Sequence, residues 1–166
     1  MALNIVLYEP EIPQNTGNIM RTCAAFDVPL HLIEPLGFYL DEAHLKRAGM
    51  DYRDLVNVTV YQDWEDFAGK NPGTWYFTTR YGHQPPDAFD FTAEEEIYFI
   101  FGKESTGIPK ELLQQHRSNC IRIPMDAGAR CLNVSNTAAI VLYEAMRQRK
   151  YASLSFEETL KPGILK

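Results

Sequence analysis

Short apolar segments alternate with amphipathic segments along almost the whole chain. Leu3–Tyr8 is a continuous apolar run that ends at a Glu-Pro pair, as expected for a strand that is buried on both faces. Asn18–Phe26 places Ile19, Cys23 and Phe26 at helical spacing. The same patterns predict further strands at Leu30–Ile33, Val56–Tyr61, Thr74–Thr79, Ile97–Phe101 and Cys120–Ile123, and further helices at Asp41–Arg47, Trp64–Ala68, Pro109–Gln115 and Asn133–Arg149.

The alternation of strands and helices predicts the fold class. Strands of four to six residues between helices are typical of an α/β domain with a mainly parallel sheet flanked by helices. The chain has 166 residues, which suits a single domain, and it contains no internal repeat and no segment with the composition of a linker. We therefore expect one domain over residues 1–155, followed by a loose tail at residues 156–166.

The helix predicted at Asn133–Arg149 is apolar on two sides. One stripe can pack on the sheet, and a second strip, formed by Ile140, Tyr143 and Met146, faces elsewhere. Either the helix is buried between two layers of its own domain, or the second strip contacts a second copy of the chain. The pattern alone leaves both arrangements open. The first stripe consists of Val134, Ala138, Val141, Leu142 and Ala145.

Charge restricts the ways in which this chain could bind RNA. The net charge is −6, although proteins that bind RNA through bulk electrostatics are basic. A surface for nucleic acid would therefore have to be local. The same cations would also be expected on an ordinary solvated surface of mixed charge. The candidates are Lys46, Arg47 and Arg53 in one stretch, and Arg80, His83 and Lys103 elsewhere.

The cysteines and the N-terminal segment bear on the cellular compartment. Cys23, Cys120 and Cys131 are an odd, scattered set, which argues against a disulfide scaffold and against a zinc site. We expect no metal, since no cluster of ligand residues is present. No basic leader precedes the first apolar run, and no segment approaches about 18 apolar residues. We therefore expect a cytoplasmic protein without a signal peptide or a membrane span.

Three polar blocks follow predicted strands, where open α/β sheets place their ligands. The first block, Asn15–Thr22, begins with residues that commonly cap helices, and capping explains Asn15 and Thr16. Capping does not explain Arg21, which shares a helix face with Asn18 three residues earlier. A guanidinium group there could hold a phosphate or an RNA hydroxyl. A solvated arginine is the simpler alternative.

The second block, Phe101–Pro109, lies between a predicted strand and a predicted helix. Its two glycines allow backbone N–H groups to approach a ligand closely, but its spacing is neither that of a P-loop nor GxGxxG. Glu104 would repel a phosphate, yet it could accept hydrogen bonds from a ribose or an amine. The block therefore favours a nucleoside-like ligand without phosphates, with a plain tight turn as the alternative.

The third block, Ile123–Asn136, leads into the long helix. Asn133 and Ser135 can cap that helix, and capping alone is enough to explain both residues. The positive end of the helix would also suit the carboxylate group of an amino-acid ligand.

Taken together, the three blocks resemble the motifs of the SPOUT methyltransferases, in the same order and spacing. The chain is most similar to the minimal, single-domain subfamily that methylates the ribose 2′-hydroxyl of wobble nucleotide 34, a cytidine or a modified uridine, in leucine tRNAs. The similarity extends from Asn4 to about Tyr151. The matching motifs are Asn15-Thr-Gly-Asn-x-x-Arg21, Phe101-Gly-x-Glu-x-x-Gly107-Ile-Pro, Ile123-Pro-Met and Leu132-Asn-x-Ser-Asn136.

The resemblance implies a fold and a cofactor. Members of the family have an α/β domain whose C-terminal part forms a deep trefoil knot, which no periodicity argument would predict because knots are nearly absent from proteins. S-adenosyl-L-methionine is implied as the cofactor, with many of its contacts made by the backbone. By position, the residues expected to contact it are Phe77, Thr78, Gly102, Glu104, Ile123, Cys131 and Asn133.

The resemblance also implies catalytic residues and partners. The catalytic arginine of the family corresponds to Arg21, and the tyrosine on the RNA side corresponds to Tyr143. The related enzymes are homodimers that pair through the first and last helices and build each site across the interface. The expected substrate is the anticodon stem-loop of tRNA. A non-catalytic nucleotide- or RNA-binding α/β module is the alternative that the sequence leaves open.

Overall fold

The structure of the chain is a computed structural model that describes residues 2–41, 43, 57–93, 95–161 and 163. Two features predicted from the sequence, most of the helix at Asp41–Arg47 and the cations Lys46, Arg47 and Arg53, lie outside the described residues.

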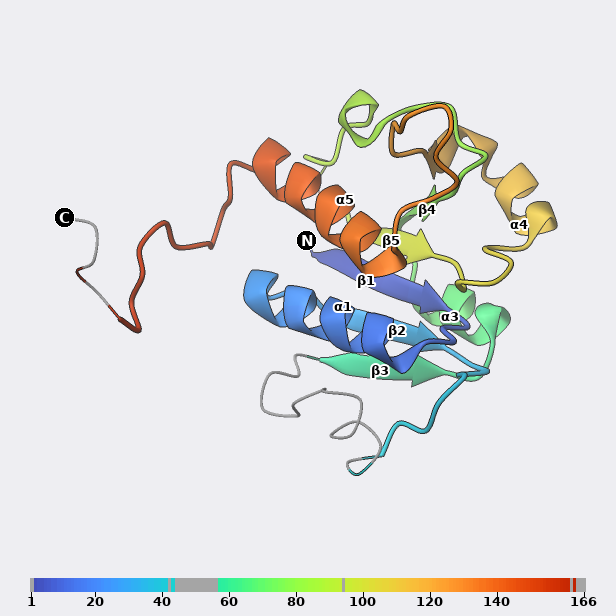
Figure 1. The fold of residues 1–166 in the computed structure, drawn as a ribbon, viewed down its shortest axis with the longest axis horizontal. Coiled ribbons are helices and arrows are strands. Elements are labelled where there is room, and N and C mark those ends of the chain that lie inside the picture. Colours follow the sequence, from blue (N-terminus) through green and yellow to red (C-terminus); the bar gives the residue numbers. More distant parts are fainter. Residues whose placement is uncertain (1, 42, 44–56, 94, 162, 164–166) are drawn as a thin grey trace.

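A six-stranded sheet forms the centre of the molecule (Figure 1). All neighbouring strands are parallel, and their order is β3-β2-β1-β5-β4-β6. The prediction of a parallel α/β domain is therefore confirmed. The strands are β1 (Leu3–Tyr8), β2 (Leu30–Ile33), β3 (Val58–Tyr61), β4 (Thr74–Thr78), β5 (Ile97–Phe101) and β6 (Cys120–Ile121).

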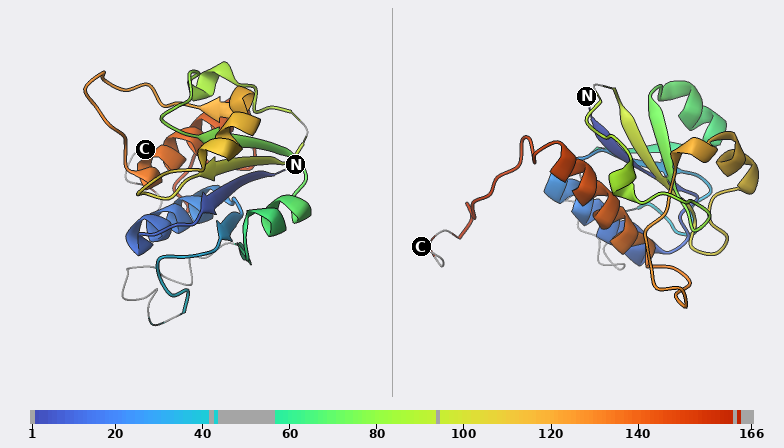
Figure 2. Two further views of the ribbon diagram at one scale, coloured as in Figure 1. Left: turned by 90° about the vertical axis from the view of Figure 1, so that its right-hand side faces the viewer. Right: turned by 90° about the horizontal axis from the view of Figure 1, so that it is seen from above.

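Helices cover both faces of the sheet. The helices α1 and α5 lie side by side on one face, and α3 and α4 lie on the other (Figures 1 and 2). No helix in the described part of the chain is both long and apolar enough to cross a bilayer. The helices are α1 (Pro13–Phe26), α3 (Trp64–Lys70), α4 (Lys110–Gln115) and α5 (Val134–Gln148), with 3-10 turns η2 (Pro86–Ala88) and η3 (Arg117–Asn119).

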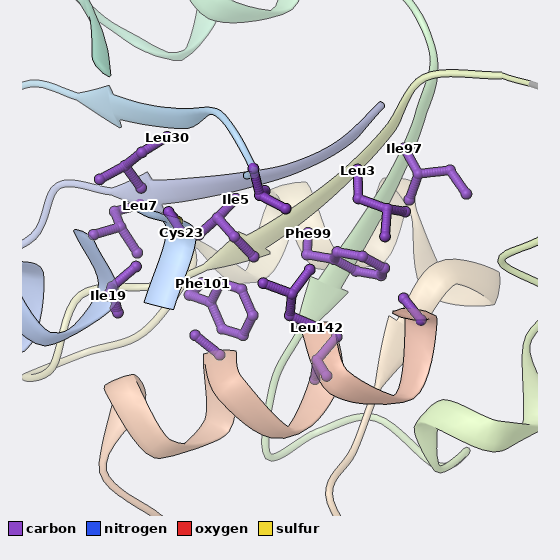
Figure 3. Packing of buried hydrophobic residues seen from close by; sticks show 14 of the residues in the cluster. Leu3, Ile5, Leu7, Ile19, Cys23, Leu30, Ile97, Phe99, Phe101 and Leu142 are labelled. Carbon is purple, nitrogen blue, oxygen red and sulfur yellow. The ribbon is translucent and has the colours of Figure 1, made fainter. Parts of the chain in front are cut away.

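Strand alternation divides the apolar side chains between two cores. Ile5 and Leu7 of β1 pack toward α1 and α5, together with Phe99 of β5 and Leu142 of α5 (Figure 3). Val6, between them in β1, packs in the second core with residues of α3 and α4. Because successive side chains of a strand point to opposite faces, continuous apolar strands require a helical layer on each side.

The start of α1 differs from the prediction. The helix begins at Pro13, five residues before the start at Asn18 that the apolar spacing predicted. Proline suits the first position of a helix because the N–H group that it lacks would have no helical partner there. The predicted start was wrong because Pro13 and Gly17, both typical of loops, lie within the first turns of this helix.

The long helix α5 confirms one expectation and corrects another. Its first apolar stripe packs on the sheet as predicted, with Ala138, Val141 and Leu142 buried. Met146 was expected on a second apolar strip, but it is 8% exposed and belongs to the same core. Ile140 and Tyr143 are 43% and 54% exposed, so the outward strip consists of these two side chains.

Candidate functional site

A cavity of about 740 Å³ opens at the carboxyl ends of β4 and β5, beside the N-terminus of α5. Its size is within the range of small-molecule sites, and parallel α/β sheets place ligands at this edge. The segments that line it are distant in the sequence and include parts of all three polar blocks. They are residues 78–81, 101–108, 122–123, 125 and 130–134, together with Ile12, Asn15 and Thr137.

Six of the seven residues expected to contact a cofactor line this cavity: Thr78, Gly102, Glu104, Ile123, Cys131 and Asn133. The seventh, Phe77, does not. Its side chain is fully buried in the core on the α3 and α4 side, where its ring lies 5.0 Å from the ring of His116. Adjacent residues of a strand point to opposite faces, which separates Phe77 from its neighbour Thr78.

The Glu104 carboxylate joins the second block to the start of α1. It accepts hydrogen bonds from the backbone N–H groups of Glu11 and Ile12, at 3.0 and 3.3 Å, and from the Asn15 side-chain amide at 3.3 Å. The N-terminus of a helix carries unpaired N–H groups and partial positive charge, so a carboxylate is favourable there. Glu104 therefore helps to hold the cavity wall in place.

Two further contacts tie the same loop to the segment before α1. The Ser105 hydroxyl donates to the Glu11 carboxylate at 2.6 Å, and the Lys103 ammonium pairs with Glu9 at 2.7 Å. The hydrogen bond with Glu9 raises the pKa of Lys103. Lys103, considered above as an RNA-binding cation, is thus already paired with a carboxylate.

Glycine is required at two positions of the loop. A Cβ atom on Gly102 would lie 2.5 Å from the backbone nitrogen of Ile108, closer than atoms can approach. Gly107 has a positive φ of 72°, and its N–H donates to the Lys103 carbonyl at 2.9 Å. The loop closes on itself because these two residues have no side chain.

Asn133 caps α5 and connects it to α1. Its side-chain oxygen accepts from the backbone N–H of Ser135 at 2.9 Å, which confirms the predicted cap. Its amide group donates to the Asn15 side-chain oxygen at 2.9 Å. Glu104, Asn15, Asn133 and Ser135 thus form one chain of hydrogen bonds, called here the rim network.

One buried side-chain oxygen of the cavity wall has no partner among the described residues. The Thr78 hydroxyl is buried and makes no hydrogen bond within the described part of the chain. A buried hydroxyl without a partner is unfavourable, and such groups are uncommon in folded proteins. Thr78 therefore marks the position where a polar atom of a ligand would be stabilised.

The two predicted catalytic residues do not line the cavity. Both Arg21 and Tyr143 are exposed. Arg21 follows Asn15 by six residues, about 9 Å along α1, and Tyr143 follows Asn133 by ten residues, about 15 Å along α5. The Tyr143 hydroxyl accepts a hydrogen bond from Tyr151 at 3.1 Å. Within one chain, the structure brings six of the seven expected cofactor residues to one cavity, but neither of the two expected catalytic residues.

Several residues of the cavity wall were not predicted. Thr137 lies one helical turn after Asn133, so the spacing along α5 could have indicated it. Met125 and Arg130 lie in the third polar block and Arg80 was considered as an RNA-binding cation, but none of the three was expected at the cofactor. No sequence signal marked Ile12, Tyr81 and Arg122, because they approach the cavity only through the fold. No cluster of His, Cys, Asp and Glu side chains that could hold a metal occurs among the residues described.

Comparison with known proteins shows which family this chain is similar to. The model of the SpoU rRNA Methylase family matches residues 2–143. A Bacillus subtilis (strain 168) protein, provisionally named tRNA (cytidine(34)-2′-O)-methyltransferase, is 51% identical over 93% of this chain and 98% of its own length. A protein with the same provisional name from Listeria innocua is 49% identical, over the whole of this chain and 99% of its own length.

Two solved structures that resemble this chain also concern RNA methylation. An RNA methyltransferase, provisionally so named, from Bacillus anthracis is 48% identical and superposes with a TM-score of 0.89, over 95% of this chain and 100% of that chain. A structure described as giving insight into 2′-OH methylation of C/U34 on tRNA is 39% identical, with a TM-score of 0.79, over 90% and 97% of the two chains. The chain belongs to the SpoU rRNA methylase family.

Proposed function

We propose that this protein transfers a methyl group from S-adenosyl-L-methionine to the ribose 2′-hydroxyl of nucleotide 34 of tRNA. The observation that carries the proposal is the cavity formed by the three polar blocks, in a chain about half identical to relatives named for this reaction. Leucine tRNAs with cytidine or modified uridine at position 34 are the proposed substrates, since the motifs resemble the subfamily that modifies them. Such substrates place the reaction in the cytoplasm.

The described residues fit the cofactor chemically. The unpartnered Thr78 hydroxyl offers a hydrogen bond to a polar group of a nucleoside. The N-terminus of α5 borders the cavity and favours a negative group such as the carboxylate of methionine. The acidic Glu104 is engaged with α1, so the loop presents no cradle for a triphosphate. These features support a nucleoside linked to an amino acid.

The reaction needs alignment more than acid or base strength. When bound, S-adenosyl-L-methionine would supply a sulfonium methyl group: the ribose oxygen would bond to the methyl carbon, the methyl–sulfur bond would break to leave S-adenosylhomocysteine, and the hydroxyl proton would pass to water. Holding two reactants in the productive orientation contributes several kcal/mol, roughly 7–11 in favourable systems. Arg21 is assigned to hold the ribose and its phosphate by charge-assisted hydrogen bonds. It positions the substrate, because a guanidinium group remains protonated in proteins and is poorly suited to act as a base.

The active enzyme is proposed to be a homodimer in which one chain supplies Arg21 and Tyr143 to the cavity of the other. Both side chains are exposed and lie far along α1 and α5 from their own cavity. The outward side of α5 also exposes the apolar Ile140, which a second copy would cover. These observations support pairing through the face formed by α1 and α5.

A threaded chain is also proposed, as the resemblance implies. The backbone of Thr79 donates to the Ile121 carbonyl at 2.9 Å, and Arg122 donates to the carbonyl of Gln84 at the same distance. Further along, Gln148 of α5 accepts a hydrogen bond from the backbone N–H of Phe91. The loop that connects β4 to β5 thus contacts β6, which precedes the segment leading to α5, and also contacts α5 itself. Contacts on both sides of that segment support a knot at this place.

Methyl transfer and its position give the direct test. The purified protein is incubated with tRNA and S-adenosyl-L-methionine, and 2′-O-methylation is mapped along the product. We expect one modified ribose, at nucleotide 34 of leucine tRNAs, and we expect Arg21→Ala to lose transfer by about a hundredfold or more while S-adenosylhomocysteine binding is retained. Cofactor binding without methyl transfer by the unaltered chain would instead support a non-catalytic module.

Mixing two inactive variants tests the composite site. Gly102→Ala distorts the loop that lines the cavity, because its Cβ would collide with the Ile108 backbone, and Arg21→Ala removes the arginine, so each homodimer is inactive. If Arg21 acts in the partner's cavity, hybrid dimers hold one intact site, and an equal mixture recovers about a quarter of the activity. If each chain builds its own site, the mixture recovers none.

A further inference from the structure

An exposed tyrosine lies at the border between the cofactor cavity and a second cavity. The second cavity has a volume of about 890 Å³ and is lined by residues 79 and 81–84 together with residues 113–115, 117–118 and 120. Thr79 and Tyr81 line both cavities, so the two lie next to each other. Tyr81 is 57% exposed, which leaves much of its side chain accessible to a ligand.

Positive charge gathers around this tyrosine. The guanidinium carbon of Arg80 lies 5.8 Å from the centre of the Tyr81 ring, and the Lys110 ammonium lies 5.9 Å from it. Arg117 lines the second cavity, and Arg122 lines the first and donates a hydrogen bond to the Arg80 carbonyl. We call these four cations and Tyr81 the Tyr81 surface.

The charge of this region is opposite to that of the whole chain. Residues 79–84, 108–118 and 120–123 contain the four cations and one carboxylate, that of Glu111, whereas the chain has a net charge of −6. In the described part of the chain, no ion pair neutralises any of the four cations. Free cations around an exposed aromatic ring suit single-stranded RNA, whose phosphates require positive charge and whose unstacked bases stack on aromatic side chains.

The position of the surface is compatible with the proposed dimer. The cation Lys110 belongs to α4, which lies on the opposite side of the sheet from α1 and α5 (Figures 1 and 2). Pairing of two chains through α1 and α5 would therefore leave α4 accessible. An RNA strand could reach the cofactor cavity along Tyr81 without displacing the second copy.

We infer that the Tyr81 surface binds the single-stranded nucleotides next to the one that is methylated. One base stacks on the Tyr81 ring, and Lys110 and Arg117 bind the phosphates that flank it. This inference rests on the proposed function, because the cofactor cavity fixes where the reacting ribose lies. It also explains how an acidic protein binds RNA: the positive charge is concentrated beside the site.

The test measures RNA affinity rather than activity. Binding of a fluorescein-labelled anticodon stem-loop RNA is followed by anisotropy in the presence of S-adenosylhomocysteine, from about 50 to about 200 mM salt. The variants are Tyr81→Leu, Tyr81→Phe and the double variant Lys110→Gln with Arg117→Gln. The matched control is Lys70→Gln, which removes a cation from α3 that is paired with Asp66.

Loss of the Tyr81 ring and loss of the two cations should change RNA binding in different ways. Tyr81→Leu is expected to weaken RNA binding about tenfold with an unchanged salt dependence, because it removes the stacking platform for a base and leaves every cation in place. Tyr81→Phe keeps the ring and should stay within about twofold of the unaltered chain. The double variant should reduce the slope of log K against log salt by about 0.7 for each phosphate that is no longer neutralised, while Lys70→Gln leaves it unchanged.

The outcomes separate this inference from the proposed function. Suppose that the unaltered chain methylates tRNA and binds the RNA, but that Tyr81→Leu and the double variant bind the RNA with the affinity of Lys70→Gln. The inference is then overturned and the proposed function stands. If the unaltered chain neither binds S-adenosylhomocysteine nor transfers methyl groups, the proposed function fails. Thermal unfolding of each variant should match that of the unaltered chain, because the Tyr81 ring and the substituted Lys110 and Arg117 are exposed.

Discussion

Two groups of polar side chains inside this small domain are built in opposite ways. The first is buried beneath β1 to β3 and consists of Asn4, His31, Tyr61 and Asn71, called here the His31 cluster. The second is the rim network, which joins the loop after β5 to the N-terminal parts of α1 and α5, beside the cavity at the ends of β4 and β5. Every side-chain polar atom of the His31 cluster has a partner in the described structure, whereas the cavity beside the rim network retains the unpartnered Thr78 hydroxyl.

The His31 cluster is closed on itself. His31 contacts the Tyr61 hydroxyl through Nδ1 at 2.9 Å and the Asn4 side-chain oxygen through Nε2 at 3.1 Å. A neutral ring donates from Nε2 to the Asn4 oxygen, and its Nδ1 accepts from the Tyr61 hydroxyl, whose single proton is shared with the Asn71 side-chain oxygen at 3.3 Å. Burial lowers the pKa of His31 to about 4, which keeps the ring neutral at physiological pH. Asn71 and Asn4 use their amide groups to bond backbone carbonyls, at 2.8 and 3.1 Å.

The difference shows that a perturbed ionisable group does not by itself identify a functional site. His31 has a strongly shifted pKa, but it lines neither of the two cavities, and each side-chain polar atom of its cluster has a partner among the described residues. The rim network, in contrast, lies beside the cavity and beside the unpartnered Thr78 hydroxyl. We therefore expect substitutions in the His31 cluster to change stability alone, and substitutions at the rim to change cofactor binding.

The largest effect on stability is expected from His31→Leu. The substitution leaves the Asn4 side-chain oxygen buried without its partner and removes the His31 contact from Tyr61, which should lower the free energy of unfolding by about 3 kcal/mol. Urea unfolding measures the loss. The affinity of the folded variant for S-adenosylhomocysteine should remain unchanged, and a large fall in that affinity would show that the two regions are coupled.

Acid should weaken the His31 cluster before it affects the cofactor cavity. The unfolded chain takes up a proton at a histidine pKa near 6.5, whereas folded His31 stays neutral until about pH 4. The stabilisation is thus complete above pH 6.5 and is lost as pH falls, about 2 kcal/mol by pH 5 and about 3 kcal/mol by pH 4. Urea unfolding across this range should show a smaller loss in His31→Leu than in the unaltered chain. Equal losses would contradict the assignment.

A smaller effect is expected at the rim from Asn133→Ala. Loss of the helix cap should cost about 1 kcal/mol of stability, and loss of the bond to Asn15 should also weaken S-adenosylhomocysteine binding about tenfold. Asn133→Ser keeps a capping oxygen but cannot make the same bond to Asn15. Serine should therefore restore stability but not affinity, as measured by urea unfolding and by calorimetry. Restoration of both by serine would reduce the role of Asn133 to capping.

The smallest and most specific effect is expected from Thr78→Val. Replacing an unpartnered buried hydroxyl with a methyl group of similar size should leave stability unchanged or raise it by up to about 1 kcal/mol. Binding of S-adenosylhomocysteine should weaken about fivefold, since the ligand loses a hydrogen bond. Thr16→Val is the matched control, because the Thr16 hydroxyl is also buried and unpartnered but does not line the cavity. A loss of affinity in the control as well would remove the special role of Thr78.

The sequence by itself determined the elements and the chemical character of the site. Periodicity located every described strand to within two residues, because buried parallel strands are short continuous apolar runs. The three polar blocks were recognisable, since glycine, asparagine and glutamate at strand ends are the residues that loops near ligands require. Six of the seven residues expected to contact a cofactor line one cavity, and their contact with the cofactor stays a prediction.

Only the tertiary structure decided which side chains face the cavity and which are used by the protein itself. Phe77 and Thr78 are adjacent in the sequence, but the pleat of β4 sends one into the core and leaves the other at the cavity. Glu104 was expected to bind the ligand, yet the approach of its loop to α1 gives its carboxylate three partners in the chain. Tyr81 meets Lys110 across about thirty residues of sequence. Such contacts depend on distances between segments that are remote in sequence, and no local pattern encodes them.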